Sequence, residues 1–99
     1  MNDERLEKAR EAIAEADREM ARLFAVRMEA VRQIAIYKRE KGLPVYDPAQ
    51  ERRVIERGLA CVEEESLRGP YEEFIRGVMD VSIRYQEKLL KDVPEETEK

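Results

Sequence analysis

Several polar side chains occupy positions at which the surrounding pattern is apolar, and their types suit the binding of a small anion. Arg27 continues a seven-residue series formed by Leu6, Ile13 and Met20, and Ile34 follows it. In a helix this spacing keeps the members on one face, so Arg27 is directed inward with its apolar neighbours. An unpaired buried cation is costly. Arg27 therefore either extends its charged end to the rim, pairs with an acid, or meets an anionic ligand.

Lys38 is a second cation on the same predicted helix face. It follows Arg27 by eleven residues, a rotation of about 20° beyond three full turns at about 100° per residue, so both cations face one volume. A lysine there also complements the dipole at the helix C-terminus, and that alternative stays open. Arg10 precedes Arg27 by about 25 Å of helix rise, too far to reach the same site within one chain. It could reach the site of a second copy.

Acidic and neutral polar residues interrupt the apolar stripes of two further segments. Glu51 lies on an apolar edge that Ile55 and Val62 continue, and Ser82 and Gln86 stand one helical turn apart in a later stripe. Each of them alone is compatible with an ordinary hydrogen-bonded core residue. Spread over three helices, the set predicts a polar pocket inside a helical bundle, cationic on one side and hydrogen-bonding on the other.

The elements that must position these residues are helices. Charged residues make up 42% of the 99 positions, with 4 Gly, 4 Pro and no Trp, a composition typical of all-α proteins. Residues 3–41 contain neither Pro nor Gly and predict one long helix, ended by Gly42. Asp47 as N-cap, with Gln50 three residues later, predicts a second helix that continues to Val62. The segment SLRGP is then expected to break the chain. A third helix follows, with a predicted inward stripe of Tyr71, Phe74, Ile75, Val78, Ser82, Tyr85 and Leu89.

The length of the first helix predicts an assembly of two chains. About 38 residues extend about 57 Å, whereas a compact domain of about 100 residues has a radius of gyration of only about 13 Å. Two shorter helices cannot cover so long an apolar stripe. We expect a homodimeric bundle built from one domain of residues 1–92. Residues 93–99 are expected to be a disordered acidic tail or the start of a linker.

Composition also excludes several classes of function. One cysteine and no histidine exclude an internal disulfide, a Ser-His-Asp triad, a Cys-His nucleophile pair and the usual zinc sites. A net charge of −4 and a pI near 5.1 argue against a nucleic-acid partner. No apolar run approaches about 20 residues, and the first ten residues lack the apolar core of a signal peptide. We therefore expect no membrane association and a cytoplasmic location.

Taken as a set, these residues resemble the all-α chorismate mutases. The likeness rests on Arg10, Arg27, Lys38, the segment PVYDPAQER and the run SIRYQ, and it extends from about residue 5 to about residue 90. The resemblance implies an intertwined homodimer with two equivalent sites. It also implies the Claisen rearrangement of chorismate to prephenate, in the pathway to phenylalanine and tyrosine, with no metal and no cofactor.

The same resemblance implies roles for the inward polar residues. Arg27 and Arg10 of the partner subunit would hold the two carboxylates of the substrate, and Ser82 would assist at a carboxylate. Lys38 and Gln86 would donate hydrogen bonds to the ether oxygen. This reaction needs no nucleophile, so the lack of histidine is no obstacle to it.

At the start of the second helix the chain follows the family at two positions and departs from it at a third. By the resemblance Glu51 would accept a hydrogen bond from the ring hydroxyl, with help from the backbone of Asp47. Many members of the family have an arginine where this chain has Gln50, and that arginine contributes to carboxylate binding. We expect weaker substrate affinity here, unless Arg53 one turn later substitutes for it.

Two other functions remain open from the sequence. An isochorismate-pyruvate lyase uses a closely related pocket for a similar dianion. A non-catalytic helical dimer that regulates or scaffolds a partner enzyme is the third hypothesis, and Gln50 would then reflect decay of the site. The retained Glu51, Ser82 and Gln86 speak against decay, because inward polar groups are costly to keep without a ligand.

Overall fold

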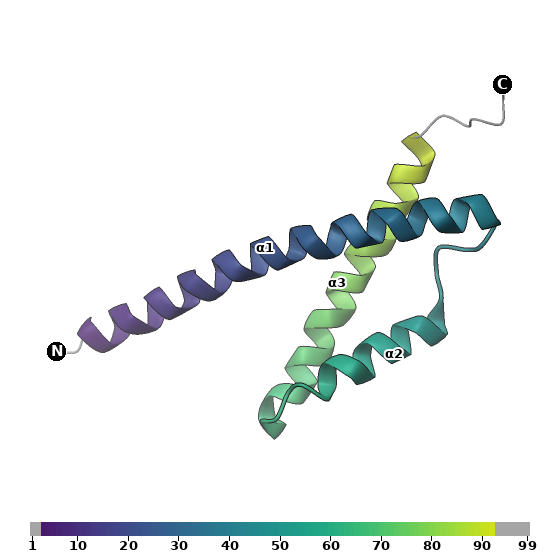
Figure 1. Ribbon diagram of the computed structural model, residues 1–99. Helices are drawn as coiled ribbons and strands as arrows, with labels where there is room; N and C mark the ends of the chain where they lie inside the picture. Colours follow the sequence, from purple (N-terminus) through teal and green to yellow (C-terminus); the bar gives the residue numbers. More distant parts are fainter. Residues whose placement is uncertain (1–2, 93–99) are drawn as a thin grey trace. The chain divides into compact units, whose positions relative to one another are not determined.

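The computed structural model describes residues 3–92, and this part of the chain is entirely helical outside its connectors (Figure 1). It contains α1 (Asp3–Lys41), α2 (Pro48–Leu59) and α3 (Glu65–Asp92). The expected all-α class, with one long and two shorter helices, is confirmed. The chain divides into two compact units, Met1–Ala30 and Val31–Lys99, and each is described by itself. The predicted tail, residues 93–99, lies outside the described residues.

Helix α1 begins and ends where its sequence predicts. Asp3 and Glu4 in the first turn and three basic residues in the last turn complement the helix dipole. Gly42 has a φ of 70°, its N–H donates to Arg39 O at 3.3 Å, and the N–H of Leu43 donates to Lys38 O at 2.8 Å. This pair of hydrogen bonds is a Schellman motif, which requires the left-handed conformation that glycine adopts without strain.

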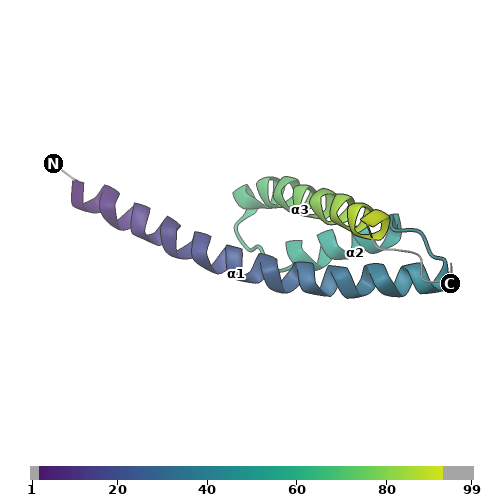
Figure 2. The ribbon, with the colours of Figure 1, turned by 90° about the horizontal axis from the view of Figure 1, so that it is seen from above.

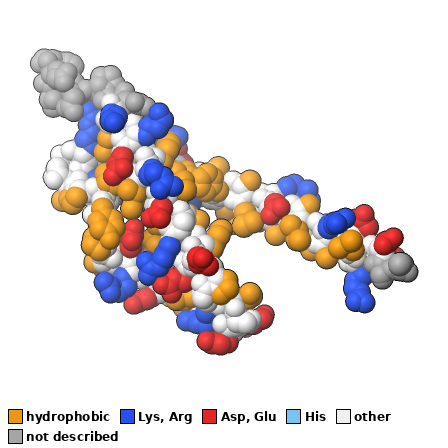
Figure 3. Space-filling model, turned by 180° about the vertical axis from the view of Figure 1, so that it is seen from behind, with side chains coloured by type: hydrophobic (Ala, Val, Ile, Leu, Met, Phe, Trp, Pro, Cys, Tyr) orange, Lys and Arg blue, Asp and Glu red, His pale blue; other side chains and the backbone are white. Residues whose placement is uncertain are grey.

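In the unit Met1–Ala30, the apolar side chains of α1 are at the surface (Figure 3). The exposed fractions lie between 45% for Phe24 and 59% for Ile13. Ion pairs one turn apart, such as Arg18 with Glu15, each stabilise the helix on its polar side by only about 0.3 to 0.5 kcal/mol. Helical stability in proteins comes mostly from packing of an apolar face, so this stripe needs a further surface. The exposed large apolar residues of this unit are Leu6, Ile13, Met20, Leu23, Phe24 and Val26.

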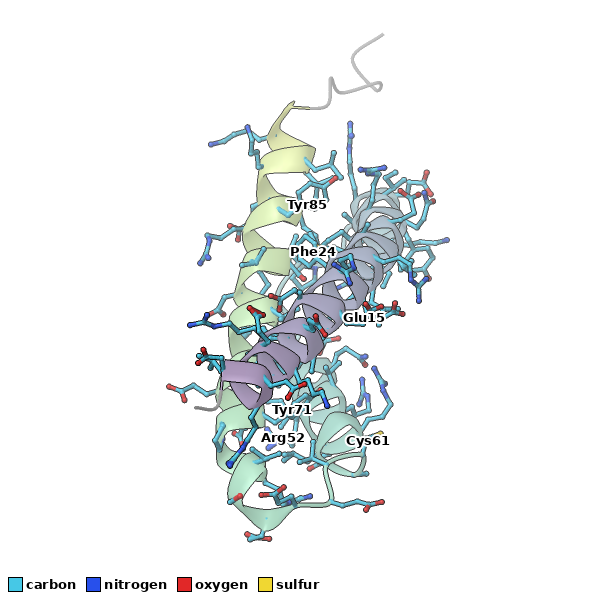
Figure 4. The ribbon with its side chains drawn as sticks, turned by 90° about the vertical axis from the view of Figure 1, so that its left-hand side faces the viewer. Glu15, Phe24, Arg52, Cys61, Tyr71 and Tyr85 are labelled. Atoms are coloured by element: carbon cyan, nitrogen blue, oxygen red, sulfur yellow. The ribbon has the colours of Figure 1, made fainter. Side chains whose placement is uncertain are left out.

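Helices α2 and α3 pack against each other and form the apolar core of the second unit (Figure 2). Ile55 of α2 is buried against Ile75 and Met79 of α3. Gly58 permits the close approach, because a Cβ atom there would lie 2.7 Å from Cε2 of Tyr71. Figure 4 labels Tyr71, whose ring lies at this helix crossing. The partly buried residues around the core are Val54, Leu59, Tyr71 and Val78.

The boundary between α2 and α3 differs from the sequence prediction. Helix α2 ends at Leu59 rather than at Val62, and SLRGP does not break the chain, because α3 begins at Glu65 and contains Pro70. The guanidinium of Arg68 donates to the carbonyl oxygens of Leu59 at 2.7 Å and Val62 at 2.9 Å. These bonds add a partner for the carbonyl group of Leu59 at the end of α2 and for that of Val62 in the connector, and they hold the first turn of α3 against both. They offset the single helical hydrogen bond that Pro70 cannot donate.

The buried side chains of α3 lie along one face of the helix, here called the α3 seam, which is apolar in its first half and polar in its second half. Ile75, Met79, Ser82 and Gln86 are buried at intervals of four, three and four residues, the spacing of one helix face. Phe74 was predicted on the inward stripe, but 53% of it is exposed. It precedes Ile75 by about 100° of rotation, and its ring instead contacts that of Tyr71 at a tilt, with the centroids 6.2 Å apart. Met79, absent from the prediction, takes the buried position.

None of the three helices in the described range combines the length and the apolar character that crossing a bilayer requires.

Candidate active site

The predicted site residues fall into both units of the chain. Arg10 and Arg27 belong to Met1–Ala30, where Arg27 is half-buried and Arg10 is exposed. That these two arginines and Lys38 serve one site stays a prediction. The other six predicted residues share the unit Val31–Lys99, and they are Lys38, Asp47, Gln50, Glu51, Ser82 and Gln86.

The polar end of the α3 seam consists of Ser82 and Gln86, which confirms that these two side chains face inward. Their exposed fractions are 5% and 7%. Ser82 Oγ donates to the carbonyl oxygen of Val78 at 3.0 Å, a common way to satisfy a hydroxyl within a helix. Oε1 of Gln86 is buried and accepts no hydrogen bond from the described part of the chain. A buried acceptor without a donor is costly, so this amide is suited to a ligand or a water molecule.

Lys38 lies on the buried side of the last turns of α1. Val31 and Ala35 are buried four residues apart, and half-buried Lys38 follows three residues later on the same face. Its Nζ donates to the carbonyl oxygen of Val45 at 2.9 Å. One of the three ammonium donors is therefore used on the connector between α1 and α2, and this bond holds the charge near the start of α2.

The first turn of α2 is built around Asp47. Its side chain accepts a hydrogen bond from the backbone N–H of Gln50 at 3.2 Å, and Pro48 follows as the first helical residue. The predicted N-cap is thereby confirmed. The side chain of Gln50 is exposed, and its Oε1 accepts a hydrogen bond from Nε of Arg53 at 3.0 Å. Glu51, the acid predicted on the apolar edge, is half-buried.

One pair that the sequence did not reveal joins α1 to α3. Nε and Nη2 of Arg32 donate to the hydroxyl of Tyr85 at 3.1 and 2.8 Å. Arg32 is exposed and Tyr85, labelled in Figure 4, is half-buried. The two residues are 53 positions apart. No local pattern marks Arg32, because a single arginine on a charged helix surface usually faces solvent.

The second unit thus presents hydrogen-bonding groups from each of its helical segments. Lys38 supplies an ammonium, Glu51 a carboxylate, and Ser82 with Gln86 a hydroxyl and an amide. Such groups can bind and orient a polar ligand and stabilise charge that develops on it. Within residues 3–92 no group of three His, Cys, Asp or Glu side chains is placed to hold a metal ion.

Comparisons with known proteins identify a family. The model of the family "chorismate mutase type II" matches residues 9–87. A similar protein is the T-protein of Haemophilus influenzae, which is 44% identical over 48 residues; these cover 48% of this chain and 13% of that protein. The chain therefore corresponds to a small part of that relative. The comparison with solved structures found no match. Because the family match covers most of its length, this chain belongs to the chorismate mutase type II family.

Proposed function

We propose that this protein is a chorismate mutase that converts chorismate to prephenate in phenylalanine and tyrosine biosynthesis. Besides family membership, the observation that supports the proposal is the burial of the Gln86 side chain. Its amide is buried beside Ser82 at the polar end of the α3 seam, and its Oε1 has no partner in the described part of the chain. A buried amide is costly to keep unless its polar atoms find partners, so it is expected where a ligand supplies one.

The chemistry fits the available groups. In the rearrangement the ether C–O bond breaks while a C–C bond forms within the same molecule, so no nucleophile, proton shuttle or cofactor is required. The enzyme must hold a flexible dianion in a chair-like shape and stabilise the negative charge that grows on the ether oxygen. In the proposed mechanism Nζ of Lys38 and Nε2 of Gln86 are the donors to that oxygen. One such donor contributes about 3 kcal/mol to transition-state stabilisation.

The hydrogen bond between Lys38 and Val45 supports this role. It fixes one N–H direction of the ammonium before any substrate arrives and leaves two other donors. A donor held in place beforehand stabilises developing charge more effectively than one that must reorient. The backbone near Asp47 and the carboxylate of Glu51, at the start of α2, are proposed to bind the ring hydroxyl.

The two carboxylates of the substrate are assigned to Arg27 and to Arg10 of the partner subunit. Arginine suits this task because its planar fork binds a carboxylate through two parallel hydrogen bonds. The assignment requires a homodimer, which we also propose. Its support is the exposed apolar stripe of α1, a surface that a second copy of the chain would cover.

The test is an ultraviolet assay of chorismate consumption by the purified protein, with the products identified by chromatography. Prephenate formation is the expected result. Isochorismate is offered in parallel, and release of pyruvate and salicylate would instead identify a pyruvate lyase. If neither substrate is consumed and a bicyclic transition-state mimic fails to bind in calorimetry, the catalytic proposal is wrong and a scaffolding role is favoured.

A further inference from the structure

The hydrogen-bonded pair of Arg32 and Tyr85 joins the two helices that carry the proposed donors to the ether oxygen. Tyr85 directly precedes Gln86 on α3, and Arg32 precedes Lys38 by six residues on α1. At about 1.5 Å per residue, the pair is within about 2 Å of Gln86 along α3 and about 9 Å of Lys38 along α1. It therefore connects the two helices beside Gln86 and within two helical turns of Lys38.

The geometry of this pair is specific. Two nitrogen atoms of one guanidinium, Nε and Nη2, converge on the single hydroxyl oxygen at 3.1 and 2.8 Å. Because the guanidinium is planar and rigid, the two bonds fix the direction of approach as well as the distance. On the same stretch of α1 the buried residues Val31 and Ala35 are small.

The separation of α1 and α3 matters because each helix carries one proposed donor. Lys38 and Gln86 must both come within about 3 Å of the position that the ether oxygen reaches in the transition state. A displacement of about 1 Å in such a group can lower the rate about 100-fold. A bond that holds the two helices at one distance acts on the rate without touching the substrate.

We propose that Arg32 and Tyr85 are positioning residues that set the spacing between Lys38 and Gln86. This inference rests on the proposed mutase function. It assigns neither residue a contact with the substrate. The pair should therefore affect kcat, through the geometry of the transition state, much more than KM.

The first test is a double-mutant cycle with Tyr85→Phe and Arg32→Lys. Tyr85→Phe removes only the hydroxyl, and Arg32→Lys keeps the charge but not the fork. Each is expected to lower kcat about 5- to 10-fold with KM changed less than about twofold, in line with a small shift of the donors. The double variant should be no slower than Arg32→Lys alone, because Tyr85→Phe then removes a hydrogen bond that is already lost. If the losses of kcat in the two single variants multiply in the double variant, or if only KM changes, the inference is wrong.

The matched control is Arg76→Ala, which removes an exposed arginine of α3 that pairs with Glu72 at 2.8 Å within the same helix. Its kcat should equal that of the wild type. Thermal unfolding of all variants distinguishes positioning from general destabilisation. A loss of kcat that follows the fall in melting temperature, rather than the presence of the hydrogen bond, would contradict a positioning role.

A second measurement does not depend on activity. Spin labels at Glu40→Cys on α1 and Glu87→Cys on α3, in a Cys61→Ser chain, report the helix separation by pulsed electron resonance. Labelled chains are diluted with unlabelled ones, so that only distances within a chain contribute. Tyr85→Phe is expected to broaden the distance distribution, and an unchanged distribution overturns the inference. If the wild type does not rearrange chorismate, the proposed function fails separately, and this distance measurement still decides whether the pair sets the spacing.

Discussion

The ammonium of Lys38 donates to the carbonyl oxygen of Val45 at 2.9 Å, so the last turn of α1 is tied to the connector that leads into α2. The same chain segment contains the Schellman motif at Gly42, which turns the backbone away from the helix axis. Together these contacts fix both the backbone and the charge of Lys38. The sequence placed a cation here, but only the structure reveals the acceptor that orients it.

Lys38→Ala is expected to lower kcat/KM about 100-fold or more, because it removes a proposed donor to the charge that develops on the ether oxygen. Lys41→Ala is the matched control. Lys41 is in the same last turn, and its Nζ lies 5.8 Å from the ring centroid of Tyr37. Steady-state kinetics of both variants with chorismate provide the measurement. Wild-type turnover by Lys38→Ala would remove Lys38 from the mechanism.

Gln86→Leu should separate stability from activity. Leucine has a similar volume and removes the buried acceptor that has no donor in the described chain. The free energy of unfolding is therefore expected to stay unchanged or to rise by about 1 kcal/mol, while kcat/KM falls about 100-fold. Urea denaturation and the chorismate assay provide the two readings. Met79→Leu, on the same seam, is the control that should retain activity. A strong loss of stability in Gln86→Leu would argue that the amide is structural.

Arg10→Ala and Arg27→Ala are expected to complement each other. In a homodimer whose sites each combine Arg27 of one chain with Arg10 of the other, both variants are inactive alone. Refolding an equal mixture gives about half heterodimers, each with one intact site, so about a quarter of the wild-type site concentration returns. Turnover of the mixture against the separate variants is the measurement. A mixture that stays inactive although it forms dimers would show that the two arginines act within one chain or not at all.

Gly58→Ala is expected to destabilise the pair of helices α2 and α3 by about 1 to 3 kcal/mol, because its Cβ would overlap the ring of Tyr71. Gly77→Ala is the control. Gly77 lies inside α3, and a Cβ added there would meet no atom within 4 Å, so alanine should stabilise the helix by about 0.5 to 1 kcal/mol. Chemical denaturation of the two variants gives both values. Equal effects of the two substitutions would mean that Tyr71 moves aside freely.

Gln50→Arg is expected to lower KM for chorismate. It introduces the arginine that the resemblance to the all-α chorismate mutases implies at this position. The added charge-assisted bond contributes about 1.5 to 3 kcal/mol, roughly a tenfold or larger effect. Arg53→Ala tests the alternative, since Nε of Arg53 bonds Oε1 of Gln50 at 3.0 Å. If Arg53 replaces the missing arginine, its loss raises KM. Arg52→Ala, at an exposed neighbouring position, is the control and should leave KM unchanged.

The sequence predicted the parts of the fold that depend on local rules. The ends of α1 follow from charge distribution and from Gly42, and the start of α2 follows from Asp47, because caps act within one helical turn. The inward positions of Ser82 and Gln86 follow from helix periodicity. Their placement could be predicted because a residue's face depends only on its spacing from its neighbours.

The parts that the sequence did not predict depend on contacts between distant residues. Gly69 and Pro70 are local breakers, yet α3 continues through them because Arg68 bonds the end of α2 and Tyr71 packs on Gly58. The bridge from Arg32 to Tyr85 joins positions 53 residues apart and has no local signature. Tertiary packing overrides local propensity at such places.

The buried face of α3 has an apolar half that packs in the core and a polar half that is proposed to bind the substrate. Ile75 and Met79 belong to the cluster that closes on Ile55, whereas Ser82 and Gln86 lie about one to three turns farther along. Because only the first half belongs to that cluster, substitutions in the second half are expected to leave its packing intact. To make this fold bind a different ligand, the residues of α3 beyond residue 81 are therefore the ones to vary. The hairpin of α2 and α3 is expected to fold regardless of these changes.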